Sequence, residues 1–459
     1  MKKQVNNSLI VSKRTGWRWL AGSLICLMTT LAGAQTLNES VIHRCGSVEY
    51  ERLLQQRNPN RLRQLTELNR LVDQKLAGDK SARAAADTTI YRIPVVVHVI
   101  HHNASNTTGG AGNGNISDAQ IISQIQVLNE DYRRKPGTNG YNTSPIGADA
   151  RVEFYLARTD PSNNPTTGIT RTYYADKATF DVSNDARLLS SLSYWPSDQY
   201  LNIWVTNLLD DPTNRSNGFI GYTQFPTAGD TLRGLSDPVD ARIDGSIIDY
   251  RVFGRNTGAV TLSLYLLGRT VTHEIGHWLG LIHPWGDGGG CNDDYVADTP
   301  LTADQTTSPT SCRQTYSTCI AGKQTRDLIE NYMMYSPDVC MNMFTAGQVA
   351  RLRAVLQLSP RRASVIRNAK GPLSETENLT VTVYPNPTSI DPAIDVQLKG
   401  SQSFNVELFD TAGRQLRATS YTNSSSTQVT LPVVGLAPGL YVVRVKTDTQ
   451  TVSKRLLVQ

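Results

Sequence analysis

The chain has 459 residues, with 45 Lys or Arg against 40 Asp or Glu, so its net charge at neutral pH is only +5. No dense basic block is present, and the composition gives no reason to expect a nucleic-acid partner. The length exceeds that of one ordinary domain. Apart from one short N-terminal run, no apolar stretch approaches the length of a membrane-spanning helix.

The N-terminus carries the pattern of a secretory signal. Lysines and arginines precede an apolar run at residues 19–34, which ends in Ala32, Gly33 and Ala34. A basic segment, a short apolar core and small residues at −3 and −1 predict cleavage before Gln35. Residues 1–34 are therefore expected to be a signal peptide, and the product to be exported.

A charged segment at residues 41–77 is predicted to be helical, with the helical part beginning at Arg44-Cys45-Gly46. The small residues after it suit proteolytic nicking, so residues 35–83 are predicted to be a removable propeptide. Six cysteines less Cys26 of the signal leave five. Cys45 is the odd one, and its thiolate is a potential metal ligand. An exposed or pairing cysteine is the alternative.

Residues 84–370 are long enough for one substantial core. Ser117 is a candidate N-cap for a helix that follows it. The periodicity predicts strands at 91–100, 151–156 and 200–205, and helices from 118, within 262–281 and at 348–358. This pattern indicates an α+β lobe with a twisted mixed sheet, followed by an irregular lower lobe. His98, His101 and His102 lie in or just after the first strand and are expected to be structural or surface residues.

One stretch reads H-E-x-x-H-x-x-G-x-x-H, from His273 to His283. On a helix, His273 and His277 lie one turn apart on the same face, so both imidazoles can bind one ion. Gly280 can leave the right-handed helical region, which lets the chain turn and bring in His283 as a third ligand. Three histidines and an open position are typical of catalytic zinc, with Glu274 as general base. Incidental histidines on an amphipathic helix are the alternative, which the complete spacing disfavours.

This motif resembles that of the metzincin zinc endopeptidases, which carry a Met-turn beneath the metal. Residues 331–336 read N-Y-M-M-Y-S and look most like the N-[FY]-M-D-Y of the pappalysin family. On that match Met333 is the turn methionine, and Tyr335 lies near the metal and assists catalysis. Met334 replaces the family's usual Asp. The resemblance spans about residues 91–367 and implies a metzincin catalytic domain.

Four further cysteines cluster after the zinc motif, and an exported chain meets an oxidising environment. Sequence alone allows three pairings. The resemblance implies the crossed pattern, Cys291–Cys319 and Cys312–Cys340, which would staple the lower lobe. A cysteine metal site is the alternative, but the C-x-x-C spacing is lacking.

The loop after Cys291 concentrates carboxylates and turn formers, a composition that suits calcium. The resemblance implies a structural calcium there, with Asp294, Asp298 and Thr299 as candidate ligands. A solvated acidic loop is the alternative.

Two further properties are implied by the resemblance alone. Related pappalysins carry Arg-Cys-Gly in a propeptide that acts as a cysteine switch, so Cys45 would bind the zinc of the precursor. Microbial relatives often favour Arg just after the scissile bond, which would make Ala82–Arg83 a point of self-cleavage.

Residues 378–459 are richer in Thr, Ser, Val and Asn, and alternating runs separated by turn formers predict an antiparallel β-sandwich. The runs lie at 379–384, 404–409, 427–431, 439–446 and 451–458. The segments YPNP, LFD, GLY and KRLLV, in this order, resemble the C-terminal sorting domain of type IX secretion. That resemblance implies the secretion machinery as a partner, and export through the periplasm of a Gram-negative bacterium to the surface or medium. A carbohydrate-binding or adhesive module is the alternative.

Two competing hypotheses about the function belong to different classes. The first is a secreted zinc endopeptidase, made as a latent precursor, that cleaves protein or peptide substrates. The second is a surface adhesin or binding protein on an inactive protease scaffold, but an inactive relative should have lost Glu274 or a ligand, and this chain keeps all four. A serralysin-like protease is a further alternative because Pro284 follows the third histidine.

Overall fold

The structure is a computed structural model, and it describes residues 42–81, 88–182, 184–208, 218–229, 241–304, 311–369, 379–398, 402–424, 427–448 and 450–459. The predicted signal peptide, the Ala82–Arg83 bond and the predicted domain limits at 370 and 378 lie outside these ranges. Residues 42–369 and 379–459 are described separately.

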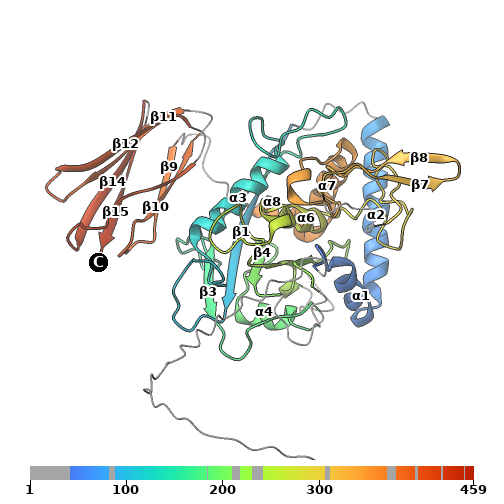
Figure 1. Ribbon diagram of the computed structural model, residues 1–459, viewed down its shortest axis with the longest axis horizontal. Coiled ribbons are helices and arrows are strands. Elements are labelled where there is room, and N and C mark those ends of the chain that lie inside the picture. Colours follow the sequence, from blue (N-terminus) through green and yellow to red (C-terminus); the bar gives the residue numbers. More distant parts are fainter. Residues whose placement is uncertain are drawn as a thin grey trace, which may run out of the picture. The chain divides into compact units, whose positions relative to one another are not determined.

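The predicted propeptide forms two helices, α1 (Ser47–Arg57) and α2 (Asn60–Ser81) (Figure 1). The expectation that the helical part begins at Arg44 is wrong, because Arg44 to Gly46 run alongside a strand of the sheet and the helix starts at Ser47. Pro59 explains the break between the two helices, since the residue before a proline is pushed out of the helical region. Asn58 is indeed extended, with φ −134° and ψ 97°.

The predicted mixed sheet is confirmed and has six strands. They are β1 (Tyr91–His101), β2 (Val152–Leu156), β3 (Ile169–Tyr173), β4 (Leu201–Thr206), β5 (Gly221–Thr223) and β6 (Gly245–Asp249). The order is β2-β1-β4-β6-β5, and β3 also pairs with β1. All pairings are parallel except that of β5 with β6. Strand β1 is central and buried on both faces, which explains its continuous apolar run.

The two faces of the sheet pack against different helices. Alternate residues of β1, from Ile93 to Val99, join the main core with α3 (Asp118–Tyr132) and α6 (Arg269–Trp278). Ile100 faces the other way and packs with residues of α1 and of α4 (Ala186–Leu192). The side chain of Asn129 ties α3 to β2 by bonding both backbone groups of Phe154 at 2.8 Å.

Some helix boundaries agree with those predicted from the sequence, and others differ. Ser117 caps α3 by accepting from the backbone N–H of Gln120, as predicted. The helix expected within 262–281 is shorter, because Gly268 adopts a left-handed conformation and α6 begins only at Arg269. The late helix is α7 (Ala346–Leu358), which begins two residues early at a capping box formed by Thr345. Helix α8 (Pro360–Asn368) follows it.

The lower lobe is irregular and cross-linked. Disulfides join Cys291 to Cys319 and Cys312 to Cys340, the pairing that the resemblance implies. The first ties the loop after α6 to a hairpin of β7 (Tyr316–Ile320) and β8 (Lys323–Arg326). The second anchors a 3-10 turn at Asp338–Cys340, just after the Met-turn.

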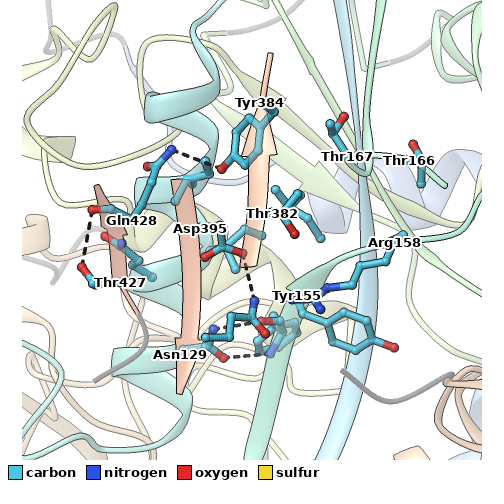
Figure 2. Close-up of a pocket in the computed structure, with 17 residues that line it drawn as sticks. Asn129, Tyr155, Arg158, Thr166, Thr167, Thr382, Tyr384, Asp395, Thr427 and Gln428 are labelled. Atoms are coloured by element: carbon cyan, nitrogen blue, oxygen red, sulfur yellow. Dashed lines mark hydrogen bonds between the residues drawn. The ribbon is translucent and has the colours of Figure 1, made fainter. Parts of the chain in front are cut away.

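The C-terminal part is an antiparallel sandwich, as predicted. One sheet has the order β13-β10-β9 and the other β12-β11-β14-β15, and their inner residues share one core. Figure 2 shows one link within it, a hydrogen bond of 3.1 Å from Gln428 to the hydroxyl of Tyr384. The strands are β9 (Leu379–Tyr384), β10 (Ala393–Leu398), β11 (Gln402–Phe409), β12 (Gln415–Ser424), β13 (Thr427–Thr430), β14 (Gly439–Thr447) and β15 (Thr451–Val458).

Two of these strands, β10 and β12, were not among the predicted runs. Strand β12 is largely exposed and polar, so it lacks the alternation that marks a half-buried strand. Among the described residues, none of the helices is both long enough and apolar enough to cross a membrane.

Candidate active site

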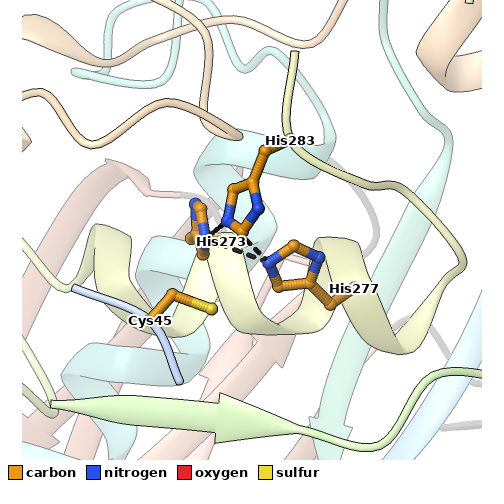
Figure 3. A group of neighbouring side chains, drawn as sticks. All are labelled: Cys45, His273, His277 and His283. Carbon is orange, nitrogen blue, oxygen red and sulfur yellow. Dashed lines mark hydrogen bonds between the residues drawn. The ribbon is translucent and has the colours of Figure 1, made fainter. Parts of the chain in front are cut away.

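Three histidine side chains meet at the end of α6 (Figure 3). His273 and His277 lie one turn apart on this helix. Gly280 then takes a φ of +83°, which turns the chain and brings His283 back towards them. The three Nε2 atoms lie 3.1, 3.1 and 3.2 Å from one another, and all three side chains are buried.

These short contacts between nitrogens are not hydrogen bonds. Nδ1 of His273 lies 2.7 Å from the carbonyl of Tyr332, and Nδ1 of His277 lies 2.8 Å from that of Leu281. A carbonyl only accepts, so each Nδ1 must carry the proton, and each neutral Nε2 presents a lone pair. Converging lone pairs require a cation between them. Nitrogen ligands at 2.0–2.1 Å in a tetrahedron lie roughly 3.3 Å apart, so the spacing fits a metal ion.

Burial keeps the imidazoles of His273 and His277 neutral, the form that binds metal. It lowers the pKa of His273 well below its usual value and that of His277 to about 3. Burial also raises the pKa of Glu274 to about 7. Glu274 extends from the same helix towards β5, where Gly221 leaves room for it: a Cβ on that glycine would lie 3.0 Å from Cγ of Glu274.

The predicted propeptide covers this site. Its strand-like segment runs beside β5: the N–H of Ile220 donates to the carbonyl of His43, and the N–H of Gly46 donates to that of Gly221. Cys45 is unpaired and buried, and its sulfur lies within 4.8 Å of the ligand nitrogens of all three histidines. Figure 3 shows Cys45 pointing at the histidine cluster from the side opposite His283.

The Met-turn lies beneath the histidines, where the sequence puts it. Met333 is fully buried, and a Cβ on Gly276, between the two helical histidines, would lie 2.4 Å from its sulfur. The ring of Tyr335 lies 5.0 Å from that of His283, and its hydroxyl donates to the carbonyl of Cys45 at 3.3 Å. Met334, at the position of the family's Asp, is an apolar core residue.

Three residues near the site were missed by sequence reasoning. Ser47 donates from its hydroxyl to Oε2 of Glu274 at 2.8 Å, Asp287 bonds Nδ1 of His283, and Asp338 binds Arg44 at 2.8 Å. Only Asp287 had a local signal, because it lies in the glycine run directly after the third histidine.

The candidate calcium loop contains both exposed and buried residues. Asp294 is buried and accepts from the hydroxyl of Thr299, and burial raises its pKa to about 7. Asp298 accepts from the hydroxyl of Thr345 and the N–H of Gly347, at the start of α7. His98 of β1 is buried between Thr170 and Asn202, which agrees with its expected structural role.

The sequence matches the pregnancy-associated plasma protein-A family over residues 259–357 and the secretion system C-terminal sorting domain over residues 382–459. An extracellular metalloprotease of Arthroderma otae is 31% identical over 259 residues, which is 56% of this chain and 76% of the relative. Another from Sordaria macrospora is 30% identical over 294 residues, 64% of this chain and 86% of the relative.

Solved structures of metalloproteases are also similar to this chain. A mutant of Tannerella forsythia promirolysin is similar with a TM-score of 0.54 and 35% identity, covering 72% of this chain and 99% of that one. Mature mirolysin with a cleaved peptide has a TM-score of 0.50 and 39% identity, covering 62% and 100%.

Fold, histidine cluster and relatives together define a secreted metalloendopeptidase with a latent precursor. The chain belongs to the pregnancy-associated plasma protein-A family of metalloproteases, the pappalysins. The expected enzyme is therefore confirmed over an adhesin, and the pappalysin assignment over a serralysin-like one. The sorting domain implies the type IX secretion machinery as a partner and a secreted or cell-surface location.

Proposed function

We propose that His273, His277 and His283 bind one zinc ion through Nε2, and that Glu274 is the general base of peptide-bond hydrolysis. The observation that carries this proposal is the convergence of three Nε2 atoms within 3.2 Å of one another. All-imidazole sites with an open position are typical of catalytic zinc. When bound, zinc supplies Lewis acidity, which lowers the pKa of water and polarises a carbonyl.

The residues of the chain handle the proton and the substrate. Glu274 accepts the proton of the attacking water and then donates it to the leaving amine. Its burial next to β5 supports this role, because an extended peptide bound along that edge strand would pass beside the carboxylate. Tyr335, near His283, is suited to donate a hydrogen bond to the oxyanion.

The test is Glu274→Ala in the mature enzyme. Peptide hydrolysis should fall by at least the roughly 10²–10⁴-fold that general-base catalysis contributes, while zinc stays near one ion per chain. Glu153→Ala, at a surface ion pair on β2, is the matched control and should keep normal turnover. Near-normal turnover of Glu274→Ala would overturn the assignment of the base.

Latency is assigned to the thiolate of Cys45, which would bind the zinc ion beside the three histidines and exclude the water that Glu274 would activate. The buried, unpaired state of Cys45 and its distance from the histidines support this. Cleavage near Arg83, outside the described residues, would release the segment.

A preference for arginine beside the scissile bond is supported by the pocket that holds Arg44. Its guanidinium binds the carboxylate of Asp338 and the carbonyl of Ser336, both at 2.8 Å, and lies over the ring of Tyr265. Because Arg44 adjoins Cys45, this acidic pocket lies next to the metal site. The mature enzyme should cleave peptides with Arg just after the bond faster than those with Ala, and Asp338→Asn should reduce that ratio. If the ratio of the two cleavage rates is unchanged in Asp338→Asn, Asp338 does not determine the preference for arginine.

A structural calcium at Asp294, Asp298 and Thr299 is a further part of the proposal. The buried Asp294 carboxylate supports it, since a nearby cation would stabilise the ionised form. Calcium should raise the unfolding temperature of zinc-loaded enzyme where magnesium does not, and Asp294→Asn should remove this effect. An effect that survives Asp294→Asn would locate the calcium elsewhere.

A further inference from the structure

His283, the third histidine, differs from the other two in the group that accepts a hydrogen bond from its Nδ1. Backbone carbonyls accept from His273 and His277. Nδ1 of His283 instead faces the carboxylate of Asp287, four residues later. A carbonyl position is fixed by the fold, whereas this acceptor is a side chain that carries a full charge.

The backbone is bent so that this carboxylate returns to the ring. The N–H of Gly286 donates to the carbonyl of His283 at 2.8 Å and closes a turn. Gly286 and Asp287 then have φ values of +79° and +52°. The left-handed region strains the backbone of a non-glycine residue. Such strain persists only where the surroundings hold the residue in place, and it gathers at functional sites.

Other contacts of the same loop hold the His283 ring. Trp285 stacks on it with a centroid distance of 4.3 Å and an interplanar angle of 6°. The backbone N–H of His283 also donates to Oδ1 of Asp287, at 3.3 Å. The His283 side chain is fully buried, and that of Asp287 is 18% exposed. The ring is therefore fixed by a stacked indole on its face and a carboxylate at its edge.

We propose that Asp287 is a positioning residue that acts through His283 and determines how tightly the enzyme holds its metal. The inference rests on the proposed role of His283 as a zinc ligand. The carboxylate holds the proton on Nδ1, so that Nε2 keeps its lone pair, and it fixes the orientation of the imidazole ring. Of the three ligands, His283 is the one with an anionic partner, and its loop carries the strained backbone.

The test compares mature enzymes with Asp287→Ala and Asp287→Asn. Asparagine retains an acceptor oxygen but loses the charge, and alanine loses both. Asp293→Ala is the control, because this exposed aspartate of the neighbouring loop bonds only a local backbone N–H in the described structure. Zinc affinity is measured by competition with a chromogenic chelator, and ligand geometry by the visible spectrum of the cobalt-substituted protein.

Asp287→Ala should bind zinc about 10–100-fold more weakly, the usual cost of losing such an outer partner, and should change the cobalt spectrum. Asp287→Asn should lie between it and the wild type, and Asp293→Ala should match the wild type. Wild-type affinity and spectrum in Asp287→Ala would overturn the inference. If the alanine variant does not fold, wild-type values for both measurements in Asp287→Asn would overturn the role of the charge.

His283→Ala separates this inference from the function beneath it. If His283→Ala loses zinc while Asp287→Ala retains it, the ligand assignment stands and only the role of Asp287 fails. If His283→Ala binds zinc as tightly as the wild type, the proposed zinc site itself is wrong.

Discussion

The hydroxyl of Ser47 lies 2.8 Å from Oε2 of Glu274, across 227 positions of the sequence. The same hydroxyl oxygen accepts from the backbone N–H of Thr223 at 2.9 Å. Ser47 thus forms hydrogen bonds with both the carboxylate of the proposed base and a backbone N–H of the edge strand. Ser47 and Cys45, two residues earlier, therefore block the groups that water and substrate would contact in the active enzyme.

We therefore expect two additive contributions to latency. The Cys45→Ala precursor should become active, or process itself, much sooner than wild type, because the thiolate no longer excludes water. Ser47→Ala should shorten the lag by less, and the double variant by more than either. The measurement is a time course of processing and peptide hydrolysis, with each change also made in a Glu274→Ala background to reveal contaminating proteases.

Thr66→Ala is the matched control, because it removes an exposed hydroxyl of α2 that bonds only within its own helix in the described structure. It should leave the lag unchanged. Equal lags in wild type and Cys45→Ala would show that latency arises from steric cover by the segment and not from the thiolate.

The Met-turn should tolerate a change that conserves volume. Met333 packs against Gly276 under the zinc helix, and a thioether is a poor zinc ligand beside three imidazoles. Met333→Leu should cost less than about 1.5 kcal/mol of unfolding free energy and keep zinc near one ion per chain. Met341→Leu, another buried methionine of the same core, is the control. Loss of zinc from a folded Met333→Leu protein would mean that the sulfur coordinates.

The two disulfides should appear in a non-reduced peptide map, with Cys45 free in the precursor. Each bridge spans 28 residues, and closing such a loop contributes roughly 3 kcal/mol in the chain-entropy model. The Cys312→Ser/Cys340→Ser variant should unfold at lower temperature than wild type. A map that joins Cys45 to any other cysteine would contradict both the pairing and the switch.

Gly280 should be sensitive to substitution because its backbone conformation and its surroundings both disfavour a side chain. Its φ is +83°, and an added Cβ would lie 2.8 Å from Val355, so alanine suffers both backbone strain and a clash. Strain alone costs about 1–2 kcal/mol, and displacement of His283 should weaken zinc binding as well. Gly322→Ala, in the turn between β7 and β8, has a φ of +71° with open space around it. It should lose stability without losing zinc affinity, as measured by chelator competition.

Features that depend on neighbouring residues could be predicted from the sequence. Helical spacing brings His273 and His277 onto one face, and a glycine at position 280 permits the turn to His283. The apolar run of β1 and the cap at Ser117 likewise follow from local rules, because a few consecutive residues determine them.

Features that depend on residues distant in the sequence could not be predicted from it. The true start of α6 is decided by Gly268, whose left-handed conformation is one of several open to a glycine in sequence. Strand β12 is held by pairing with β11 and not by its own pattern. The bond of Arg44 to Asp338 joins groups 294 positions apart, and no spacing rule reaches that far.

The sequence by itself predicted a metal site with three histidines and a base, because one helix and one turn carry all four groups. The tertiary structure decided what surrounds it. It places Cys45 and Ser47 over the site. It also pairs Asp338 with Arg44 and brings the carboxylate of Asp287 against Nδ1 of His283. These partners are selected by packing and charge in three dimensions, where the identity of a neighbour depends on the whole fold.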